Sequence, residues 1–553
     1  MAQRARNILF IMCDQLRWDY LSCAGHPTLR TPNIDALAAR GVRFARAYCQ
    51  SPICGSSRMS FYTGRYVQSH GAAWNNFPLK VGEMTLGDHL RPLGVRTALV
   101  GKTHMKADID GMARLGIDPQ SVIGVRVAEC GFEPYERDDG LHGSGPDGKY
   151  DPRAPRYERY LNELGYAGDA PWDDWANAGE DDDGNLLSGW LLKHSRRPAR
   201  VREEHSETPY MTRRAMRFIE DAGDAPWCLH LSYIKPHWPY IVPAPYHAMY
   251  GEKDVVPAVR SEAERSDPHP IFREFMNHRV GKAFSRDEVR EAVIPAYMGL
   301  IAQIDDQIGV LMRFLEGRGL MEDTMIVFTS DHGDYLGDHW LGEKDLFHDA
   351  SVRIPLIVVD PSSQADATRG TVSDALVESI DLAPTFVEFC GGDPIPHRLE
   401  GRALQALLHH SEPQPWRRYA ISEYDYSVSP TARVLGVRPM DARMFMVVDD
   451  RWKYVHAEGF RPMLFDLDKD PQELTDLGAD PAFAAERARL LDALNLWARR
   501  QSQRTALSEE QILAMRGRSL RRGILLGFWD EAELPDELVH EKWRGARRAL
   551  EPR

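Results

Sequence analysis

Cysteine is scarce in this chain of 553 residues, which contains only seven. The seven are scattered and never form a Cys-x-x-Cys pair: Cys13, Cys23, Cys49, Cys54, Cys130, Cys228 and Cys390. An odd number without paired spacing predicts neither a disulfide framework nor a zinc site built from cysteines. We expect most of these side chains to be small buried hydrophobes.

Long apolar runs and an excess of positive charge are also missing. No stretch approaches the roughly 18 apolar residues that a membrane-spanning helix needs. The apolar run at residues 7–13 is too short for a signal peptide and lacks its cleavage site. The formal charge of -14 disfavours nucleic acid and anionic membranes as partners, because like charges repel. We therefore expect a soluble, cytoplasmic protein with neither kind of partner.

The chain is long enough for two packed domains or one elaborated α/β domain. Short apolar runs predict strands at residues 7–13, 42–48, 96–100, 227–233, 325–329 and 355–359. Helical patterns lie between them, for example after Thr31 and at residues 297–316. This alternation predicts a mostly parallel sheet with helices on both faces. Residues 138–204 are rich in Gly, Pro, Asp and Arg and predict long surface loops.

The pattern changes after about residue 415. Short alternating runs at residues 419–426, 445–448 and 452–456 predict a small antiparallel sheet, and a helix is expected at residues 481–501. We predict three parts: a large domain at 1–414, a smaller C-terminal domain at 415–505, and a tail at 506–553 that is available for an oligomer contact.

One cysteine has distinctive neighbours, in the segment Ser-Pro-Ile-Cys54-Gly-Ser-Ser-Arg58-Met-Ser-Phe-Tyr-Thr-Gly-Arg65. Alone, its first five residues from Cys54 are more typical of a buried, inert Cys at a helix start. The whole segment resembles the sulfatase signature, in which Cys-x-Pro-x-Arg precedes Thr-Gly-Arg and the Cys is oxidised to formylglycine. Ser56 stands where that signature has Pro. The resemblance implies that Cys54 provides the nucleophile and that Arg58, one helix turn on, holds it.

Oxygen and nitrogen donors follow two of the predicted strands. Asp14 and Gln15 end the first, and Asp331 and His332 follow the strand at 325–329. Both segments resemble metal sites of the alkaline phosphatase superfamily. The resemblance implies that these four residues and the side chain of residue 54 hold one divalent ion. An ordinary turn with a helix cap is the alternative, but it predicts no partner carboxylate on another strand.

The donor set departs from that of standard sulfatases. Gln15 and His332 stand where those enzymes carry Asp and Asn, which resembles the phosphonate monoester hydrolase branch instead. An amide and an imidazole lower the negative charge and soften the ligand set. We therefore expect Mn²⁺ in preference to Ca²⁺.

The same resemblance extends to catalytic side chains. His237, in Lys-Pro-His-Trp-Pro, would protonate the leaving oxygen or bind the transferring group, and Lys344 would neutralise its charge. Lys102 and His104, in Gly-Lys-Thr-His, are sulfatase-like: the Lys binds the formylglycine hydroxyl and the sulfate, and the His deprotonates the second hydroxyl. Outside the family pattern, a His beside Pro and Trp is usually a packing residue. Substrate-binding roles are also implied for Asn75 and Thr103.

The resemblance implies an alkaline-phosphatase-like α/β sandwich, with a large mixed sheet flanked by helices and a smaller C-terminal α+β domain carrying a short antiparallel sheet. It also implies maturation by a formylglycine-generating enzyme, a small anionic ester as substrate, and a homodimer or homotetramer.

Two activities remain open. Lys102 and His104 favour an arylsulfatase-like enzyme that is promiscuous toward phosphonate monoesters and phosphodiesters. Gln15, His332 and the segment around His237 favour a phosphonate monoester hydrolase or phosphodiesterase. A choline-type sulfatase, and a non-catalytic binding protein whose Cys54 stays a thiol, are further alternatives.

Overall fold

The computed structural model describes residues 6–140, 145, 148, 151–410, 415–500, 507–516, 529 and 533. The chain divides into two compact units, one of Met1–Pro394 with Leu399–Arg499 and one of Ile395–Arg398 with Arg500–Arg553. In the second unit, helix α17 (Glu509–Met515) is capped by Ser508, whose hydroxyl accepts a hydrogen bond of 3.1 Å from the Gln511 amide. Most of the predicted tail at 506–553 lies outside the described residues, and the boundaries at 414 and 505 stay predictions.

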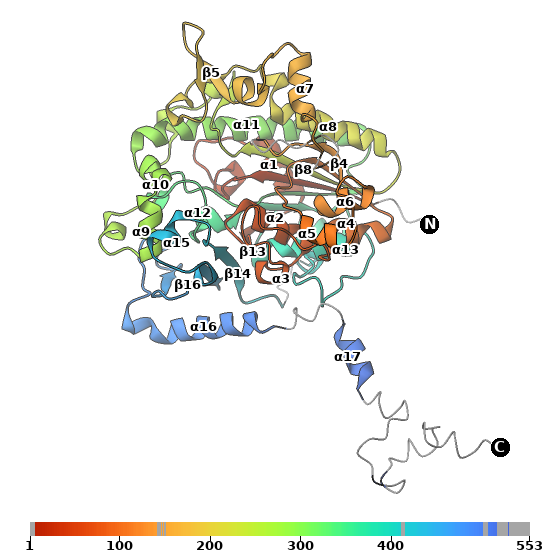
Figure 1. Cartoon of the computed structure of the whole chain (residues 1–553), viewed down its shortest axis with the longest axis vertical. Coiled ribbons are helices and arrows are strands. Elements are labelled where there is room, and N and C mark those ends of the chain that lie inside the picture. Colours follow the sequence, from red (N-terminus) through yellow and green to blue (C-terminus); the bar gives the residue numbers. More distant parts are fainter. Residues whose placement is uncertain are drawn as a thin grey trace, which may run out of the picture. The chain divides into compact units, whose positions relative to one another are not determined.

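A nine-stranded mixed sheet forms the centre of the first unit, in the order β11-β2-β12-β10-β1-β8-β3-β4, with β13 also paired to β2 (Figure 1). Its strands are β1 (Asn7–Asp14), β2 (Val42–Tyr48), β3 (Arg96–Gly101), β4 (Glu133–Arg137), β8 (Trp227–Pro236), β10 (Thr324–Ser330), β11 (Arg353–Ile354), β12 (Leu356–Val359) and β13 (Thr371–Glu378). Strands β10, β1, β8, β3 and β4 run parallel, and β12 is antiparallel to β10 and β2. The predicted mixed sheet is confirmed.

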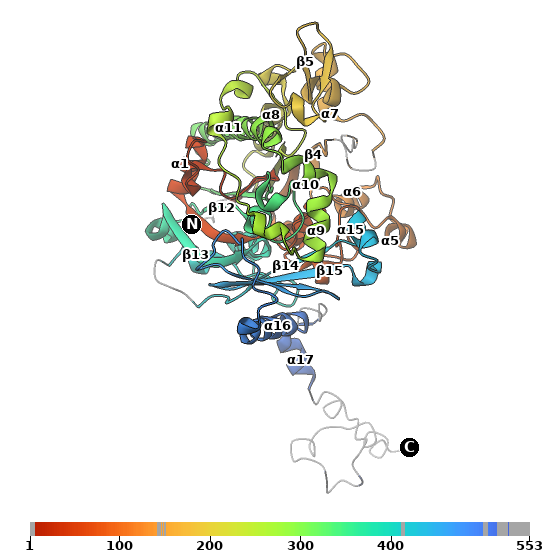
Figure 2. The same cartoon turned by 90° about the vertical axis from the view of Figure 1, so that its left-hand side faces the viewer.

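Helices cover both faces of this sheet, as Figures 1 and 2 show. The helices of the first unit are α1 (Pro32–Arg40), α2 (Cys54–Thr63), α3 (Val67–His70), α4 (Leu86–Leu90), α5 (Ile109–Arg114), α6 (Val122–Ala128), α7 (Arg156–Glu163), α8 (Glu207–Ala222), α9 (Pro270–Asn277), α10 (Arg279–Phe284), α11 (Asp287–Gly317), α12 (Asp349–Val352), α13 (Leu382–Phe389), α14 (Gln405–Leu408), α15 (Pro430–Val434) and α16 (Ala484–Ala498).

Strand β1 shows why its sequence is apolar throughout. Ile8, Phe10 and Met12 pack into the core formed with α2, α4 and α13. The alternate residues of the same strand, from Leu9 to Cys13, pack into the core formed with α1, α8 and α11. All eight residues of β1 are buried, as expected for a central strand covered on both faces.

The register of β1 against β10 brings two distant carboxylates together. Cys13 pairs with Ser330, so Asp14 and Asp331 leave the same edge of the sheet on neighbouring strands. Gln15 then has a φ of 65°, which marks the point where the chain turns away from the strand. Carboxyl ends of parallel strands commonly host chemistry, so this edge is the expected place for a site.

The chain after residue 415 forms a four-stranded antiparallel sheet in the order β14-β15-β16-β17. Its strands are β14 (Ala420–Asp425), β15 (Arg443–Val448), β16 (Trp452–Ala457) and β17 (Met463–Asp466). Helix α16 packs on this sheet through Leu490, and it begins after a short 3₁₀ turn at Pro481–Phe483. The predicted small sheet is confirmed, although its fourth strand was not predicted.

Residues 138–204 differ from the long loops predicted for them. This region contains helix α7, a π-helical turn at Trp172–Ala176, and the short strands β5 (Ala178–Glu180), β6 (Leu186–Ser188) and β7 (Pro198–Ala199). Tyr157, Leu161 and Trp172 are buried, so local packing organises a segment whose composition resembles that of a loop.

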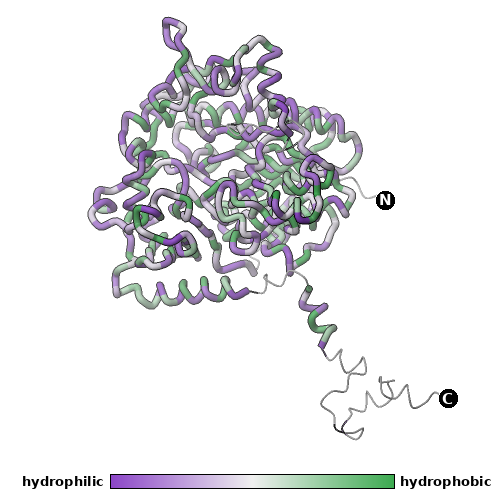
Figure 3. Tube along the Cα trace, viewed as in Figure 1, coloured by the Kyte–Doolittle hydropathy of each residue, from purple (hydrophilic) through white to green (hydrophobic). Residues whose placement is uncertain are grey.

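Figure 3 shows hydrophobic residues concentrated in the inner elements and hydrophilic ones on the outer loops and helices of the first unit. Among the described helices, none is both long and apolar enough to span a membrane.

Candidate active site and metal centre

A cavity of about 250 Å³ opens at the edge of the sheet where β1 and β10 end. Its lining combines chemically reactive, aromatic and acidic side chains: Ile53, Cys54, Trp74, Asn75, Asn76, Lys102, His104, Asp139, Gly140, Trp172, Ile234, His237, Trp238, Glu343, Lys344 and Asp345. Six of the predicted site residues therefore meet in one cavity although they come from five separate segments of the chain.

Cys54 is the first residue of α2 and is fully buried. Ile53 before it is extended, with a φ of -128°, so the helix starts at the cysteine and directs its N-terminal amides toward the cavity. The Gly55 amide donates to Asn75 Oδ1 at 2.8 Å, which fixes this first turn. The positive end of a helix dipole favours an anionic group at this position.

Four potential metal ligands, Asp14, Cys54, Asp331 and His332, place one donor atom each within 4.8 Å of one another. All four are fully buried. Cys54 Sγ lies 3.0 Å from His332 Nε2 and 3.8 Å from Asp14 Oδ1. Two carboxylates, an imidazole and the side chain of residue 54 form a compact set that suits a single divalent cation.

The orientation of His332 is set by its backbone neighbours. Its Nδ1 lies 2.9 Å from the Gly333 carbonyl, which leaves Nε2 directed at Cys54. A Cβ on Gly333 would stand 2.0 Å from the Ala350 carbonyl oxygen, so only glycine permits this close approach. Burial favours the neutral ring, but Asp331 and Cys54 outweigh it and raise the pKa of His332 to about 9.

Arg58 compensates the charge of the two carboxylates. Its Nε donates to Asp331 Oδ2 at 2.8 Å and its Nη2 to Asp14 Oδ2 at 3.2 Å, while Nη1 donates to the Lys102 carbonyl and to Ser232 Oγ. Lys102 Nζ donates to Asp14 Oδ2 at 2.6 Å. Burial opposes ionisation of Asp14, yet these cations, led by Lys102, hold the pKa of that carboxyl well below its usual range.

Gln15 links the donor cluster to Lys344. Its side-chain oxygen accepts a hydrogen bond of 2.9 Å from Lys344 Nζ, and its side-chain nitrogen donates to Asp334 and to Tyr240. Its backbone amide donates to Asp331 Oδ1 at 3.0 Å. The amide oxygen is thus engaged with a cation, and ligation of a metal by Gln15 stays a prediction.

His237 and Lys344 form a contact of 3.2 Å between Nε2 and Nζ. His237 Nδ1 lies 2.8 Å from the Trp238 carbonyl, an arrangement that requires a proton on Nδ1 and leaves Nε2 to accept. Burial, with help from Lys344, lowers the pKa of His237 well below its usual range. Burial and Lys102 do the same for His104. Both rings are therefore neutral beside positively charged lysines.

Thr103 occupies a different position from the other predicted residues. Its hydroxyl donates to Glu129 Oε2 at 3.1 Å, and it is fully buried outside the cavity lining. Lys102 and His104 line the cavity, while the hydrogen bond to Glu129 holds the Thr103 side chain away from it.

Comparison with known protein families decides the identity. The family model described as Sulfatase matches residues 6–119 and 150–392, and the model described as N-sulphoglucosamine sulphohydrolase, C-terminal, matches residues 337–500. The chain belongs to the sulfatase family. The predicted family is confirmed, and with it the predicted class of enzyme, a hydrolase.

Similar proteins match this sulfatase over most of its length. A multifunctional alkaline phosphatase superfamily protein, PehA, of Trinickia caryophylli is 32% identical and covers 87% of this chain and 92% of its own. An arylsulfatase of Clostridium perfringens is 28% identical, covering 85% and 90%. The structure of a phosphonate monoester hydrolase from Silicibacter pomeroyi has a TM-score of 0.79 at 28% identity, covering 92% and 98%.

The aromatic part of the cavity lining was not predicted as part of the site. It consists of three tryptophans, Trp74, Trp172 and Trp238, and the same lining includes the carboxylates Glu343 and Asp345. Trp238 follows His237 directly, so the family motif offered one signal. Trp172 lies in the segment interpreted as loops that could shape the site, but no motif singled out this residue.

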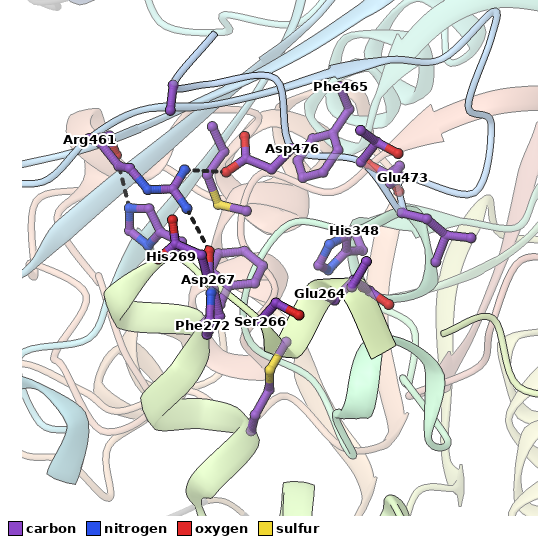
Figure 4. A pocket seen from close by; sticks show the side chains of 17 residues that line it. Glu264, Ser266, Asp267, His269, Phe272, His348, Arg461, Phe465, Glu473 and Asp476 are labelled. Carbon is purple, nitrogen blue, oxygen red and sulfur yellow. Dashed lines mark hydrogen bonds and ion pairs between the residues drawn. The ribbon is translucent and has the colours of Figure 1, made fainter. Parts of the chain in front are cut away.

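A second cavity, of about 340 Å³, lies between α9 and the small sheet (Figure 4). Its charged groups are mostly paired with one another: Arg461 bonds Asp476, and Glu473 contacts Lys453 at 2.6 Å. The His269 ring lies 2.9 Å from the Arg461 carbonyl. None of the four clustered donor residues lines this cavity, whereas Cys54 lines the first one, which is therefore the candidate active site.

Proposed function

We propose that this chain is a metal-dependent sulfuric ester hydrolase, arylsulfatase-like, that acts through a formylglycine nucleophile made from Cys54 by a formylglycine-generating enzyme. We further propose that it is promiscuous toward phosphonate monoesters and phosphodiesters. One observation carries the proposal: the side chain of residue 54 starts a helix inside the same 4.8 Å donor cluster as Asp14, Asp331 and His332.

A divalent cation, with Mn²⁺ favoured and Ca²⁺ the alternative, would be held by Asp14, Asp331, His332, residue 54 and Gln15, and would polarise the ester and neutralise developing charge. A hydrated formylglycine supplies two hydroxyls on one carbon, one to attack sulfur or phosphorus and one to allow later carbon–oxygen cleavage that releases the anion.

Arg58 and Lys102 maintain positive charge at the nucleophile. Both are fully or almost fully buried and both contact Asp14, so they are fixed before any substrate arrives. Preorganised cations of this kind stabilise charge that develops on the equatorial oxygens during transfer.

Lys344 supplies positive charge for the oxygens of the transferring group. Burial disfavours its charged form, but the surrounding anions outweigh that and raise the pKa of Lys344, so it keeps its proton. His237 is neutral with its Nε2 turned to Lys344, so it orients the ammonium group, and the departing oxygen takes its proton from water.

His104 is placed to serve the second half of the reaction. It is neutral, lines the cavity near Cys54, and follows Lys102 by two residues. A neutral imidazole can take the proton of the second hydroxyl as the carbon–oxygen bond breaks. Water then restores the hydrated aldehyde, so that the overall change is hydrolysis of one ester bond.

A phosphonate monoester hydrolase or phosphodiesterase is the second candidate, favoured by Gln15 and His332 and by the Silicibacter pomeroyi relative. Sulfate monoesters, phosphonate monoesters and phosphodiesters each carry one negative charge, so one cationic site suits all three. The test is kcat/KM for matched aryl esters of the three classes, measured on Mn²⁺-loaded protein. Sulfate turnover at background level would leave only the second candidate.

Two control measurements check that Cys54 has been converted and that the metal is required. Intact-mass spectrometry should show a mass about 18 Da below that of the unmodified chain, the difference between cysteine and formylglycine. Removal of the metal with a chelator should abolish turnover, and Mn²⁺ should restore it. An unmodified thiol together with no turnover would favour the non-catalytic alternative, and hydrolysis confined to quaternary ammonium sulfate esters would favour the choline-type one.

A further inference from the structure

Part of the cavity lining is apolar and aromatic. Trp74, Trp172 and Trp238 line it together with Ile53 and Ile234. Trp172 is anchored by a hydrogen bond of 2.9 Å from its Nε1 to Glu207 Oε1. The cavity volume of about 250 Å³ is below the ~300 Å³ at which pockets begin to hold drug-sized ligands. This wall suits the single flat ring of a small aryl ester.

Three carboxylates line the same cavity, and their surroundings differ. Asp139 forms an ion pair with Arg137 and accepts a hydrogen bond from the His104 amide. Asp345 accepts a hydrogen bond of 2.8 Å from the Tyr424 hydroxyl. Among the described residues, no hydrogen bond or ion pair holds the carboxylate of Glu343, and the cation that its charge acts on is the neighbouring Lys344, whose pKa it helps to raise.

The position of Glu343 is set by its backbone. It has a φ of 59°, and its carbonyl accepts a hydrogen bond of 2.6 Å from the Tyr335 amide. Lys344 follows it, with Nζ over the Trp238 ring at 5.7 Å from the centroid. The carboxylate thus belongs to the turn that places a catalytic cation against the aromatic wall.

We propose that Glu343 is a specificity-determining residue that selects esters whose aromatic leaving group carries no negative charge. This inference rests on the proposed function, because it assigns the leaving group of that reaction to the tryptophan-lined part of the cavity. An anionic leaving group would meet a like charge, held by no hydrogen bond or ion pair, in a partly desolvated cavity. A cationic leaving group would be attracted by that charge and could also form cation–π interactions with the tryptophan rings.

The test uses three phenyl esters with aminomethyl, carboxamide or carboxylate in the para position, made as sulfates or phosphonates according to which class the wild-type enzyme hydrolyses. kcat/KM is measured for each ester with wild type, Glu343→Gln, Glu343→Asp and Asp345→Asn. Comparing variant with wild type for each ester cancels the different intrinsic reactivities of the three leaving groups.

In Glu343→Gln we expect the ratio of kcat/KM for the cationic ester to that for the anionic ester to fall on the order of tenfold, because one unit charge has been removed. Glu343→Asp should retain the wild-type ratio to within about twofold, since the charge remains.

Other outcomes overturn the proposal. If Glu343→Gln lowered kcat/KM for all three esters by the same factor, Glu343 would only support the turn that positions Lys344. If Asp345→Asn produced the change in ratio instead, the selecting charge would be Asp345. Hydrolysis of none of the three esters by mass-verified wild type would overturn the proposed function, and this inference with it.

Discussion

The reactive residues of the candidate site and the aromatic part of the cavity lining are held in place by different interactions. Among the reactive residues, Arg58 and Lys102 hold Asp14 and Asp331 through buried ion pairs on strand ends and a helix start. In the aromatic part of the lining, tryptophan rings packed on loops and turns form the surface. The centroids of Trp190 and Trp238 lie 5.3 Å apart, for example, and Trp190 packs behind the lining. Buried ion pairs fix the reactive residues, and aromatic packing shapes the rest of the lining. Changes in the two parts should therefore have different consequences.

The largest expected effect concerns the reactive residues. Cys54→Ala should lower kcat for every ester class by roughly 10³-fold or more, because the nucleophile is lost. Steady-state kinetics on the best sulfate and phosphonate esters checks it. Cys49→Ala is the matched control: Cys49 is equally buried and its Sγ donates to the Ser51 carbonyl, but it is not in the donor cluster. Full activity in the Cys54 variant would defeat the mechanism.

The next effect separates the two halves of the reaction. His104→Ala should lower steady-state kcat by about 10²- to 10⁴-fold, the usual contribution of a positioned base. Release of the alcohol precedes the step that His104 serves, so the variant should still show a burst of about one alcohol per active site in rapid-mixing experiments. Loss of the burst together with the steady-state rate would place His104 in the first half of the reaction instead.

These residues also show how far sequence reasoning reached. Strand β1 and the acid that ends it could be predicted, because an apolar run followed by Asp is a local pattern. The parallel register then brings Asp14 beside Asp331 across more than 300 residues. The direction of the Thr103 side chain could not be predicted from the sequence, because a motif identifies residues but not the side to which each side chain points.

The aromatic part of the lining could not be predicted from the sequence, for a physical reason. Trp172 is only 5% exposed, and its indole is held by Glu207, which lies 35 residues later on α8. Its local sequence is rich in Asp, Ala and Gly and has no periodicity of its own. Such a segment takes its structure from tertiary contacts, which a single sequence does not display. Strand β17 was missed similarly, since it is four residues long and pairs only with β16.

A smaller effect is expected at the aromatic wall. Trp238→Leu should lower kcat/KM for phenyl esters about tenfold and for methyl esters far less, because only the ring loses its stacking surface. The Trp238 indole nitrogen is buried without a hydrogen-bond partner among the described residues, so the change breaks no such bond. Trp175→Leu, outside the cavity lining, is the control. Equal losses for phenyl and methyl esters would mean that Trp238 acts through Lys344.

The smallest effect concerns acid stability of the helix that starts at Cys54. His70 Nδ1 accepts a hydrogen bond of 3.1 Å from the Ala72 amide, and its Nε2 lies 3.0 Å from the Ser60 hydroxyl of α2. Because Nδ1 accepts a hydrogen bond, the ring must be neutral. Burial, with Arg65 and Lys80, lowers the pKa of His70 to about 3. The unfolded chain binds that proton near pH 6.5, so stability is complete above this pH and is lost as the pH falls toward the folded pKa. At pH 5.5 the loss should be about 1 kcal/mol.

His70→Asn keeps an acceptor for the Ala72 amide but does not titrate. Its Tm should therefore fall less than that of wild type between pH 7 and 5.5, and an equal fall in both proteins would show that His70 does not contribute.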